Sequence, residues 1–256
     1  HARPALEAGK AVLCEKALTL NHADATAMVE IANRQGVFLM EAMWMACNPV
    51  VRALRAGLTA GRFGVPRQLH ADLGFVVDRP VDDRLLDPAL GGGVLLDMGI
   101  YPLAFAHLML GTAERLTVTG DLSSTGIDLD VAIAGRYPGG AVAALTASMT
   151  ATSPRTATIA TTAGLLELPA PFHHPSYVVF TPTEGEPERI EGEEPLLGSG
   201  LGNEAAEVQR CLREGLTESP LVPHEQTLTL MRQMDEIRAQ LGVRYPGEEE
   251  HTLAGA

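Results

Sequence analysis

The sequence predicts an α/β chain in two parts: a short parallel sheet, followed by a larger and mostly antiparallel sheet. Helix-like and strand-like segments alternate with short connections over residues 1–46, which is the pattern of a parallel sheet. From about residue 66 the pattern changes to strand-like segments joined by turn residues, which is typical of an antiparallel sheet. Helical segments at 93–110 and after residue 200 interrupt and complete the second part.

The boundaries of the first part are marked by capping residues. Asn21 is a favourable N-cap for a helix that runs to about Gln35, and Gly36 ends it. Asn48 caps another helix, with Pro49 at its first position. The predicted elements are a helix over 2–8 that ends at Gly9, a strand over 11–15, a helix over 22–35, a strand over 37–42 and a helix from residue 49.

The second part contains five strand-like segments. These segments are 67–78, 115–124, 127–150, 155–169 and 176–182. The tripeptide 138–140, Pro-Gly-Gly, predicts a hairpin turn inside the third of them. Residues 182–200 are rich in Glu, Gly and Pro and are expected to form exposed turns and loop.

Composition excludes two classes of function. The chain has 256 residues, a net charge of −13 and a pI of about 5.0, so binding to nucleic-acid phosphates is not expected. The apolar runs between residues 91 and 111 are broken by Asp97, Pro102 and His107. Because of these interruptions, we expect that no apolar run reaches the roughly 18–20 residues that a membrane span needs. The sequence also shows no signal-peptide pattern.

The cysteines point to a reducing compartment. Cys14, Cys47 and Cys211 are odd in number and far apart, which is not the pattern of a disulfide framework or a zinc site. We therefore expect a cytoplasmic location.

Lys16 is the first candidate for chemistry. It is one of only two lysines among 19 cationic residues, and it directly follows the predicted strand together with Glu15. The carboxyl ends of parallel strands are where open α/β sheets bind ligands. An ammonium there can donate a hydrogen bond to a substrate oxygen and lower the pKa of a neighbouring acid. The alternative is a surface lysine paired with Glu15.

Asp97 and Tyr101 are the second candidates. They are four residues apart in a predicted helix and so share a face. A tyrosine beside a lysine can exchange a proton with substrate, because the cation favours the phenolate. The alternative is an aspartate placed in a first helical turn by the helix dipole, and a packed tyrosine. Gly99 and Pro102 both disfavour a regular helix and indicate a local irregularity.

The histidines offer less. His70 and Asp72 alternate on one strand, but two ligands are too few for a metal site. His173 and His174 are adjacent on a predicted strand and would point to opposite faces. No motif supports a Ser/His/Asp triad, and we expect no metal.

A glycine-rich nucleotide-binding turn is not found. Such a turn, G-x-G-x-x-G, holds a pyrophosphate at a helix N-terminus after the first strand of the sheet. The only glycine cluster, GGGVLLDMG from residue 91, has Leu96 where the third glycine would stand. The sequence starts inside a helix, as if the opening part of the sheet were missing.

Several motifs resemble the glucose–fructose oxidoreductase, inositol dehydrogenase and rhizopine catabolism (Gfo/Idh/MocA) family, and in particular its dimeric dihydrodiol dehydrogenase branch. The most specific of these motifs are the Glu-Lys pair after the first strand and the D-x-G-x-Y pattern in a helix. The stretches that carry the resemblance are LEAGKAVLCEKAL, EAMW, GRFGVPRQLHADLGF, DPALGGGVLLDMGIYPLAFAHLMLG and the C-terminal EAAEVQRCLREGLTESPLVP. The resemblance implies a partial Rossmann-type parallel sheet at 1–46. It also implies an open-faced sheet domain with helices on one face at 47–256, with the C-terminal helix packing back on the Rossmann part.

The resemblance also implies an activity. It implies an NAD- or NADP-dependent dehydrogenase that acts on CH–OH groups of a sugar, polyol or trans-dihydrodiol. Separately, the antiparallel sheet with apolar residues that one helix layer does not cover predicts a homodimer formed through the sheet face. The apolar residues Val142, Leu145 and Met149 are the expected contributors to that face.

Individual residues carry over by position. Lys16 matches the lysine of the family's Glu-Lys-Pro motif, and Tyr101 matches the proton donor of this branch. Asp97 matches the aspartate one turn before that tyrosine. Glu15, Lys16 and Trp44 are the expected contacts to the cofactor, and Phe75 is expected to line the substrate pocket.

Three departures from the family pattern favour a second hypothesis, a catalytically inactive sugar-sensing or partner-binding relative, or a fragment unable to bind cofactor. About 60–80 residues of the Rossmann start are missing. Ala17 replaces the proline after Lys16, and since a cis bond to alanine costs about 3–4 kcal/mol, a trans bond and a displaced lysine are expected. Ala46 and Cys47 replace an arginine and an aromatic residue.

Overall fold

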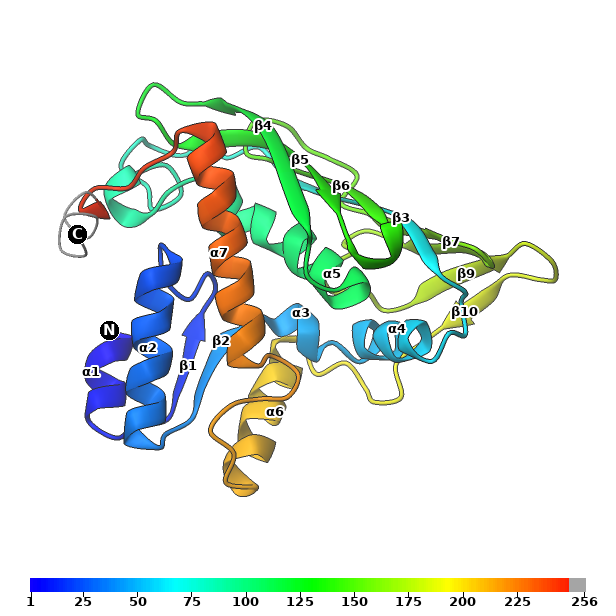
Figure 1. The fold of residues 1–256 in the computed structure, drawn as a ribbon, viewed down its shortest axis with the longest axis horizontal. Helices are drawn as coiled ribbons and strands as arrows, with labels where there is room; N and C mark the ends of the chain where they lie inside the picture. The colour runs from blue at the N-terminus through cyan, green and yellow to red at the C-terminus, as the bar shows by residue number, and fades with distance from the viewer. Residues whose placement is uncertain (249–256) are drawn as a thin grey trace.

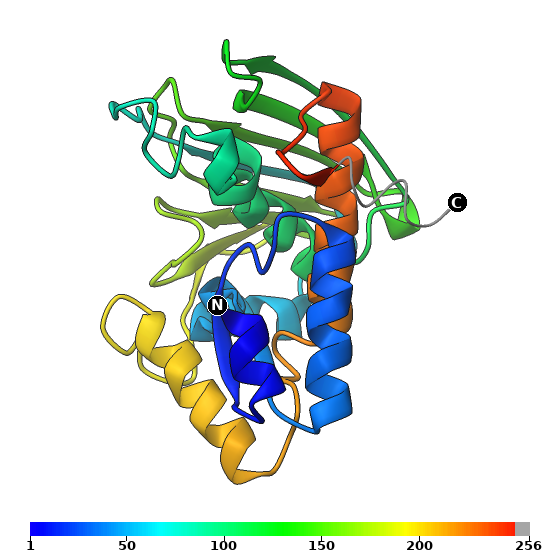
Figure 2. The same ribbon diagram turned by 90° about the vertical axis from the view of Figure 1, so that its left-hand side faces the viewer.

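Two sheets organise the molecule. The computed structural model describes residues 1–248 of the chain, and they form a two-stranded sheet and an eight-stranded sheet. Figures 1 and 2 show the small sheet with α1 and α2 on one side of the molecule and the large sheet on the other. The two-part prediction is confirmed.

The small sheet is parallel. β1 (Val12–Glu15) pairs in parallel with β2 (Leu39–Ala42), and α1 (Ala2–Glu7) and α2 (His22–Gln35) flank them. The predicted caps of α2 are confirmed. The Asn21 side chain accepts a hydrogen bond from the backbone N–H of Asp24 at 2.8 Å. Gly36 ends the helix with a φ of 62°, a conformation that favours glycine.

Two helices follow β2. α3 (Trp44–Cys47) is a single turn that the sequence did not reveal, because four residues carry no periodic signal. α4 (Pro49–Thr59) begins as predicted, with Asn48 Oδ1 accepting from the backbone N–H of Val50 at 2.9 Å. Asn48 is buried, and its amide also donates to the carbonyl of Pro175.

The large sheet has the strand order β10-β9-β8-β7-β3-β6-β5-β4. Every neighbouring pair is antiparallel except β3 and β6, which run in parallel. The strands are β3 (Pro66–Gly74), β4 (Arg115–Leu122), β5 (Asp128–Arg136), β6 (Val142–Ser148), β7 (Ala157–Thr161), β8 (Gly164–Leu168), β9 (Val178–Pro182) and β10 (Glu188–Ile190). The turn between β5 and β6 lies at 138–140 as predicted, whereas β10 replaces part of an expected loop.

Helices cover one face of this sheet. Figures 1 and 2 show α5 (Ile100–Leu110) packed below it, and no helix of residues 1–248 lies above it. On β6, Leu145 is buried beside α5, while Val142 is 46% exposed on the open face. The prediction that Val142, Leu145 and Met149 lie on the open face is therefore wrong for Leu145 and Met149. Leu145 is 1% exposed because its position on β6 faces the helices. Met149 is 2% exposed and directly follows β6, where its backbone pairs with Leu129 and Val77.

The segment before α5 is irregular, as Gly99 and Pro102 indicated. η1 (Pro88–Leu90) is a short 3₁₀ turn, and η2 (Leu95–Gly99) is a π-helical turn that runs into α5. Within residues 1–248, the stretch Pro88–Leu110 is long and apolar enough to cross a membrane, despite its polar residues. However, 83% of that window is buried inside the molecule, which is also true of core helices in globular domains.

The C-terminal helices connect the two parts. α6 (Leu201–Arg213) packs on α3, and α7 (His224–Leu241) packs on both α2 and β4. His224 Nε2 lies 2.9 Å from the carbonyl oxygen of Leu39 in β2. One helix thus contacts both the small and the large sheet, as Figure 1 shows.

Candidate functional site

Lys16 lies at the carboxyl end of β1 and points toward η2. Its ammonium donates to the backbone oxygen of Asp97 and to Asp97 Oδ1, the latter at 3.1 Å. The side chain is only 11% exposed, so the alternative of a surface lysine paired with Glu15 does not hold. The expectation of a trans bond and a displaced lysine is also wrong, because the Lys16–Ala17 bond is cis and Lys16 contacts Asp97.

The chain after Lys16 is fixed by a buried carboxylate that the sequence analysis missed. Glu41 in β2 is 2% exposed. Its side chain accepts from the backbone N–H of Leu18 at 3.1 Å and from the hydroxyl of Thr227 at 2.9 Å. Burial raises the pKa of Glu41. A charged residue inside the buried run LMEA was the available signal, since buried carboxylates need partners.

Tyr101 completes a cluster with Lys16 and Asp97. Asp97 lies in the π-helical turn and Tyr101 in the first turn of α5. The Lys16 ammonium is 5.0 Å from the centre of the Tyr101 ring. Arg84 adds a second cation, 3.6 Å from Asp97 Oδ1. Residues 81 positions apart in sequence therefore meet in one site.

Trp44 orients the Tyr101 hydroxyl. The indole Nε1–H of Trp44, on α3, donates to Tyr101 Oη at 2.8 Å. Burial raises the pKa of Tyr101 to about 12, and the Trp44 hydrogen bond lowers it only in part. The resting form is the phenol, so the expectation that Lys16 favours the phenolate is not met. The ammonium faces the ring, and desolvation of the phenolate dominates.

His173 and His174 belong to this site, although the sequence analysis placed them on a strand. They lie in the turn between β8 and β9, where Pro171 and Pro175 disfavour a strand. His174 stacks on Trp44, with ring centres 5.0 Å apart and planes at 27°. His173 lies 4.8 Å from the Tyr101 ring. The two flanking prolines were the overlooked signal.

His173 is neutral. Its pKa is lowered to about 3, mainly by burial and also by the neighbouring His174 and Arg155. Its Nδ1 is buried with no hydrogen-bond partner in the described part of the chain. Trp44, Tyr101 and the two histidines thus form an aromatic wall without a charge.

A pocket of about 220 Å³ lies beside Lys16. Lys16, Thr19, Arg84 and Asp97 supply its polar groups, and the backbone of 91–93 forms one side. A Cβ at Gly92 would lie 2.8 Å from the backbone nitrogen of Asp87, so the tight turn requires glycine. Open space and a cation thus lie at the end of β1, the edge where open α/β sheets bind ligands.

The remaining predicted residues lie apart from this cluster. Glu15 ends β1 with an exposed side chain, next to Lys16 in the chain. Phe75 follows the end of β3 and is 39% exposed, and in residues 1–248 no ring contact joins it to Trp44 or Tyr101. His70 and Asp72 lie on the open face, where Asp72 Oδ1 accepts from the backbone N–H of Arg155 at 2.7 Å. The described residues contain no group of three metal-ligating side chains.

Comparison with known proteins identifies the family. Residues 1–43 match the model of the oxidoreductase family with an NAD-binding Rossmann fold, and residues 51–167 match the GFO/IDH/MocA C-terminal domain. A trans-1,2-dihydrobenzene-1,2-diol dehydrogenase of Oryctolagus cuniculus is 36% identical over 250 residues, covering 95% of this chain and 75% of the relative. The Homo sapiens enzyme of that name is 35% identical over 257 residues, with 95% and 74% coverage.

Solved structures share the fold. An aldose–aldose oxidoreductase from Caulobacter crescentus, complexed with glycerol, has a TM-score of 0.83 at 20% identity and covers 94% of this chain and 72% of its own. A levoglucosan dehydrogenase in complex with NADH and levoglucosan has a TM-score of 0.82 at 17% identity, with 94% and 74% coverage. With the motif matches and the relatives above 30% identity, the chain belongs to the Gfo/Idh/MocA family of NAD(P)-dependent oxidoreductases.

Proposed function

We propose that this chain interconverts an alcohol and a carbonyl on a sugar, a polyol or a trans-dihydrodiol, with Tyr101 exchanging the proton. The names of the curated relatives support the dihydrodiol, and those of the structural neighbours support the carbohydrate. The observation that carries the proposal is the convergence of Lys16, Asp97 and Tyr101 at the carboxyl end of β1.

The protein's own groups divide the work. When bound, the cofactor supplies or accepts the hydride. During reduction the Tyr101 phenol donates its proton to the carbonyl oxygen, which becomes the hydroxyl, and during oxidation the phenolate takes that proton back. Asp97 holds the ammonium of Lys16 in place through two hydrogen bonds. The positive charge of Lys16 there stabilises negative charge that develops on the reacting oxygen.

Three residues are proposed to receive the cofactor. Lys16 and Glu15 lie at the end of β1, and Trp44 begins α3 shortly after the end of β2. Trp44 is held between Tyr101 and His174, so its position next to the reacting groups is rigid.

Cofactor binding and turnover test the proposal separately. NADH and NADPH fluorescence titrations measure binding, and assays over a panel of sugars, polyols and dihydrodiols measure turnover. Tyr101→Phe is expected to lower turnover by at least about a hundredfold, while leaving cofactor affinity unchanged. Tyr177→Phe, in the turn before β9, is the matched control and should retain full activity.

Two outcomes would contradict it. Saturable cofactor binding with no turnover on any substrate of the panel indicates the non-catalytic relative. Full activity in the Tyr101→Phe variant removes the proton-transfer role.

We also propose a homodimer formed through the open face of the large sheet, and a cytoplasmic location. The open face carries small side chains such as Ala132, Ala134 and Ala144, which allow close approach of a second sheet. The three free cysteines are consistent with a reducing compartment. A monomeric mass by light scattering at micromolar concentration would contradict the dimer, and recovery in a membrane or secreted fraction would contradict the location.

A further inference from the structure

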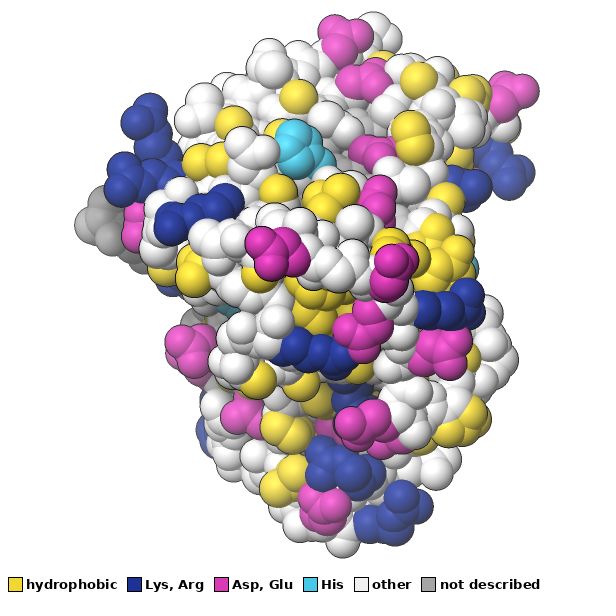
Figure 3. All heavy atoms as spheres, turned by 90° about the vertical axis from the view of Figure 1, so that its right-hand side faces the viewer, with side chains coloured by type: hydrophobic (Ala, Val, Ile, Leu, Met, Phe, Trp, Pro, Cys, Tyr) yellow, Lys and Arg dark blue, Asp and Glu magenta, His cyan; other side chains and the backbone are white. Residues whose placement is uncertain are grey.

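A groove runs along α4 on the side of the molecule away from the small sheet. Its volume is about 540 Å³, within the range of small-molecule binding sites. α4 forms one wall, and Leu108 at the end of α5 and Leu221 before α7 line it from below. Figure 3 shows this side of the molecule, where hydrophobic side chains lie between basic and acidic ones.

Small apolar side chains form part of the α4 wall of the groove. Ala53, Ala56 and Ala60 recur along one face of the helix. Ala46 of α3 extends the floor with another small side chain. Small residues next to Leu108 and Leu221 leave an elongated apolar space that is open to solvent.

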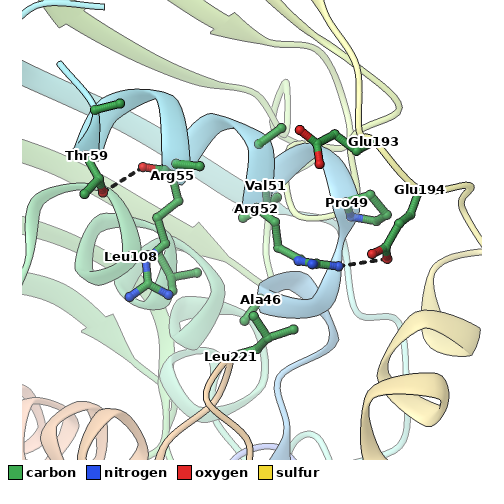
Figure 4. A pocket seen from close by; sticks show the side chains of 13 residues that line it. Ala46, Pro49, Val51, Arg52, Arg55, Thr59, Leu108, Glu193, Glu194 and Leu221 are labelled. Carbon is green, nitrogen blue, oxygen red and sulfur yellow. Dashed lines mark hydrogen bonds and ion pairs between the residues drawn. The ribbon is translucent and has the colours of Figure 1, made fainter. Parts of the chain in front are cut away.

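The two arginines of the groove differ in whether they form an ion pair. Arg52 is paired with Glu194, with 2.9 Å between Nη1 and Oε2. Arg55 has no ion pair among residues 1–248, and Thr59 donates its hydroxyl to the Arg55 carbonyl, not to a ligand. Figure 4 shows the Arg55 guanidinium extended toward Leu108, whereas Glu193 and Glu194 lie toward the opposite end.

The charge of Arg55 also acts on a neighbouring histidine. His107 precedes Leu108 in α5, and its Nδ1 is buried without a hydrogen-bond partner in the described chain. Burial lowers the pKa of His107, and Arg55 lowers it further, while Glu225 opposes them. His107 is therefore neutral and leaves Arg55 as the cation at this end of the groove.

We propose that this groove binds an amphipathic monocarboxylate, with the carboxylate on Arg55 and the apolar body along α4. A guanidinium binds a carboxylate through two parallel hydrogen bonds, and the alanine face with Leu108 and Leu221 buries an aliphatic or aromatic body. A single unpaired cation matches a single negative charge. The site lies outside the pocket of Lys16 and does not depend on the proposed function.

Calorimetric titration with octanoate tests the site. We expect saturable binding with one octanoate per chain. Arg55→Gln should weaken octanoate binding at least about tenfold, because the charge partner is lost. Ala56→Leu should weaken it by at least about as much, since a larger side chain fills the groove. Both residues lie on the exposed face of α4, so thermal unfolding should be unchanged.

Matched controls separate this site from general association. Arg213 is exposed at the end of α6 and has no ion pair in the described structure, so Arg213→Gln should leave octanoate affinity within about twofold. Octylammonium has the same tail with the opposite charge and should bind more weakly than octanoate. NADPH should not displace octanoate.

Four results would overturn the proposal. They are octanoate binding that does not saturate, binding that Arg55→Gln leaves unchanged, octylammonium that binds as tightly as octanoate, and displacement by NADPH. A halved mass by light scattering in Arg55→Glu would instead assign the groove to contact with a second copy of the chain.

Discussion

Burial decides the protonation state of the Tyr101 hydroxyl. Its hydroxyl receives a hydrogen bond from Trp44, and its ring faces the Lys16 ammonium, yet its pKa is raised to about 12. The proton therefore stays on the phenol at neutral pH, which suits donation to a carbonyl.

We predict that the two reaction directions respond differently to pH. Oxidation needs the Tyr101 phenolate, whose fraction grows about tenfold per pH unit below the pKa. The logarithm of kcat/KM for oxidation should therefore rise by about one per pH unit between about pH 7 and pH 10. Reduction uses the phenol and should be nearly constant over that range. Steady-state assays in both directions measure this, and an oxidation rate that levels off near neutral pH would exclude Tyr101 as the base.

Glu204 gives a second residue-scale prediction. It lies in the first turn of α6, is 6% exposed, and its Oε2 has no hydrogen-bond partner in residues 1–248. Burial and then Glu15 raise its pKa from 4.5 to about 7. The folded state thus holds more protons than the unfolded state between these values. The stability from this group is present below pH 4.5 and is lost as pH rises through about 7.

Glu204→Gln removes this pH dependence. Relative to the variant, the free energy of unfolding of the wild type should fall by up to about 3 kcal/mol between about pH 5 and pH 8. Urea unfolding at both pH values measures the difference. Glu236→Gln, at an exposed position on α7, is the control. Equal pH profiles for wild type and Glu204→Gln would show that Glu204 titrates normally.

At the scale of elements, Asp128 fixes the start of the π-helical turn that carries Asp97. Asp128 begins β5, is fully buried, and accepts from the backbone N–H of Leu95 at 2.6 Å through Oδ2. A Cβ at Gly93 would lie 2.4 Å from Asp128 Oδ1. The Tyr245 hydroxyl donates to the Gly92 carbonyl at 3.0 Å and holds the same turn.

Removing the Asp128 carboxylate should therefore affect both stability and activity. Asp128→Ala leaves the buried Leu95 N–H unpaired and should cost about 1–3 kcal/mol in the free energy of unfolding. It should also lower kcat, because Asp97 lies in this turn and Tyr101 follows it. Asp128→Asn retains an oxygen acceptor, so it should lower the free energy of unfolding and kcat less than Asp128→Ala does. An alanine variant that matches the wild type in urea unfolding would show that Leu95 finds another partner.

At the scale of the whole molecule, the open face of the large sheet sets the expected assembly. Thr146 and Ala144 of β6 are exposed at its centre, and the strand alternation points their neighbours in β6 toward α5. Ala144→Arg should convert the proposed dimer to a monomer, because it buries a charge without a partner between two sheets. Light scattering measures the mass, and activity of the monomer shows whether the site needs the partner. Glu236→Arg, at an exposed position on α7 away from the open face, is the control.

Much of this architecture could be predicted from local signals. Asn21, Gly36 and Asn48 mark helix ends by their own side chains or backbone freedom, so neighbours in sequence were sufficient. α3 and β10 were missed, since three or four residues carry no periodic signal. Lys16 and Tyr101 were identified as site residues by their motifs, and their role in catalysis stays a prediction.

The sequence by itself determined the order of the elements, their caps and the presence of Lys16, Asp97 and Tyr101 in family motifs. Only the tertiary structure decided that Trp44 donates to Tyr101 across 57 residues and that His174 stacks on Trp44. It also decided that the phenol keeps its proton. Capping and alternation depend on residues a few positions apart, whereas ring contacts and desolvation depend on how segments far apart in the sequence pack together.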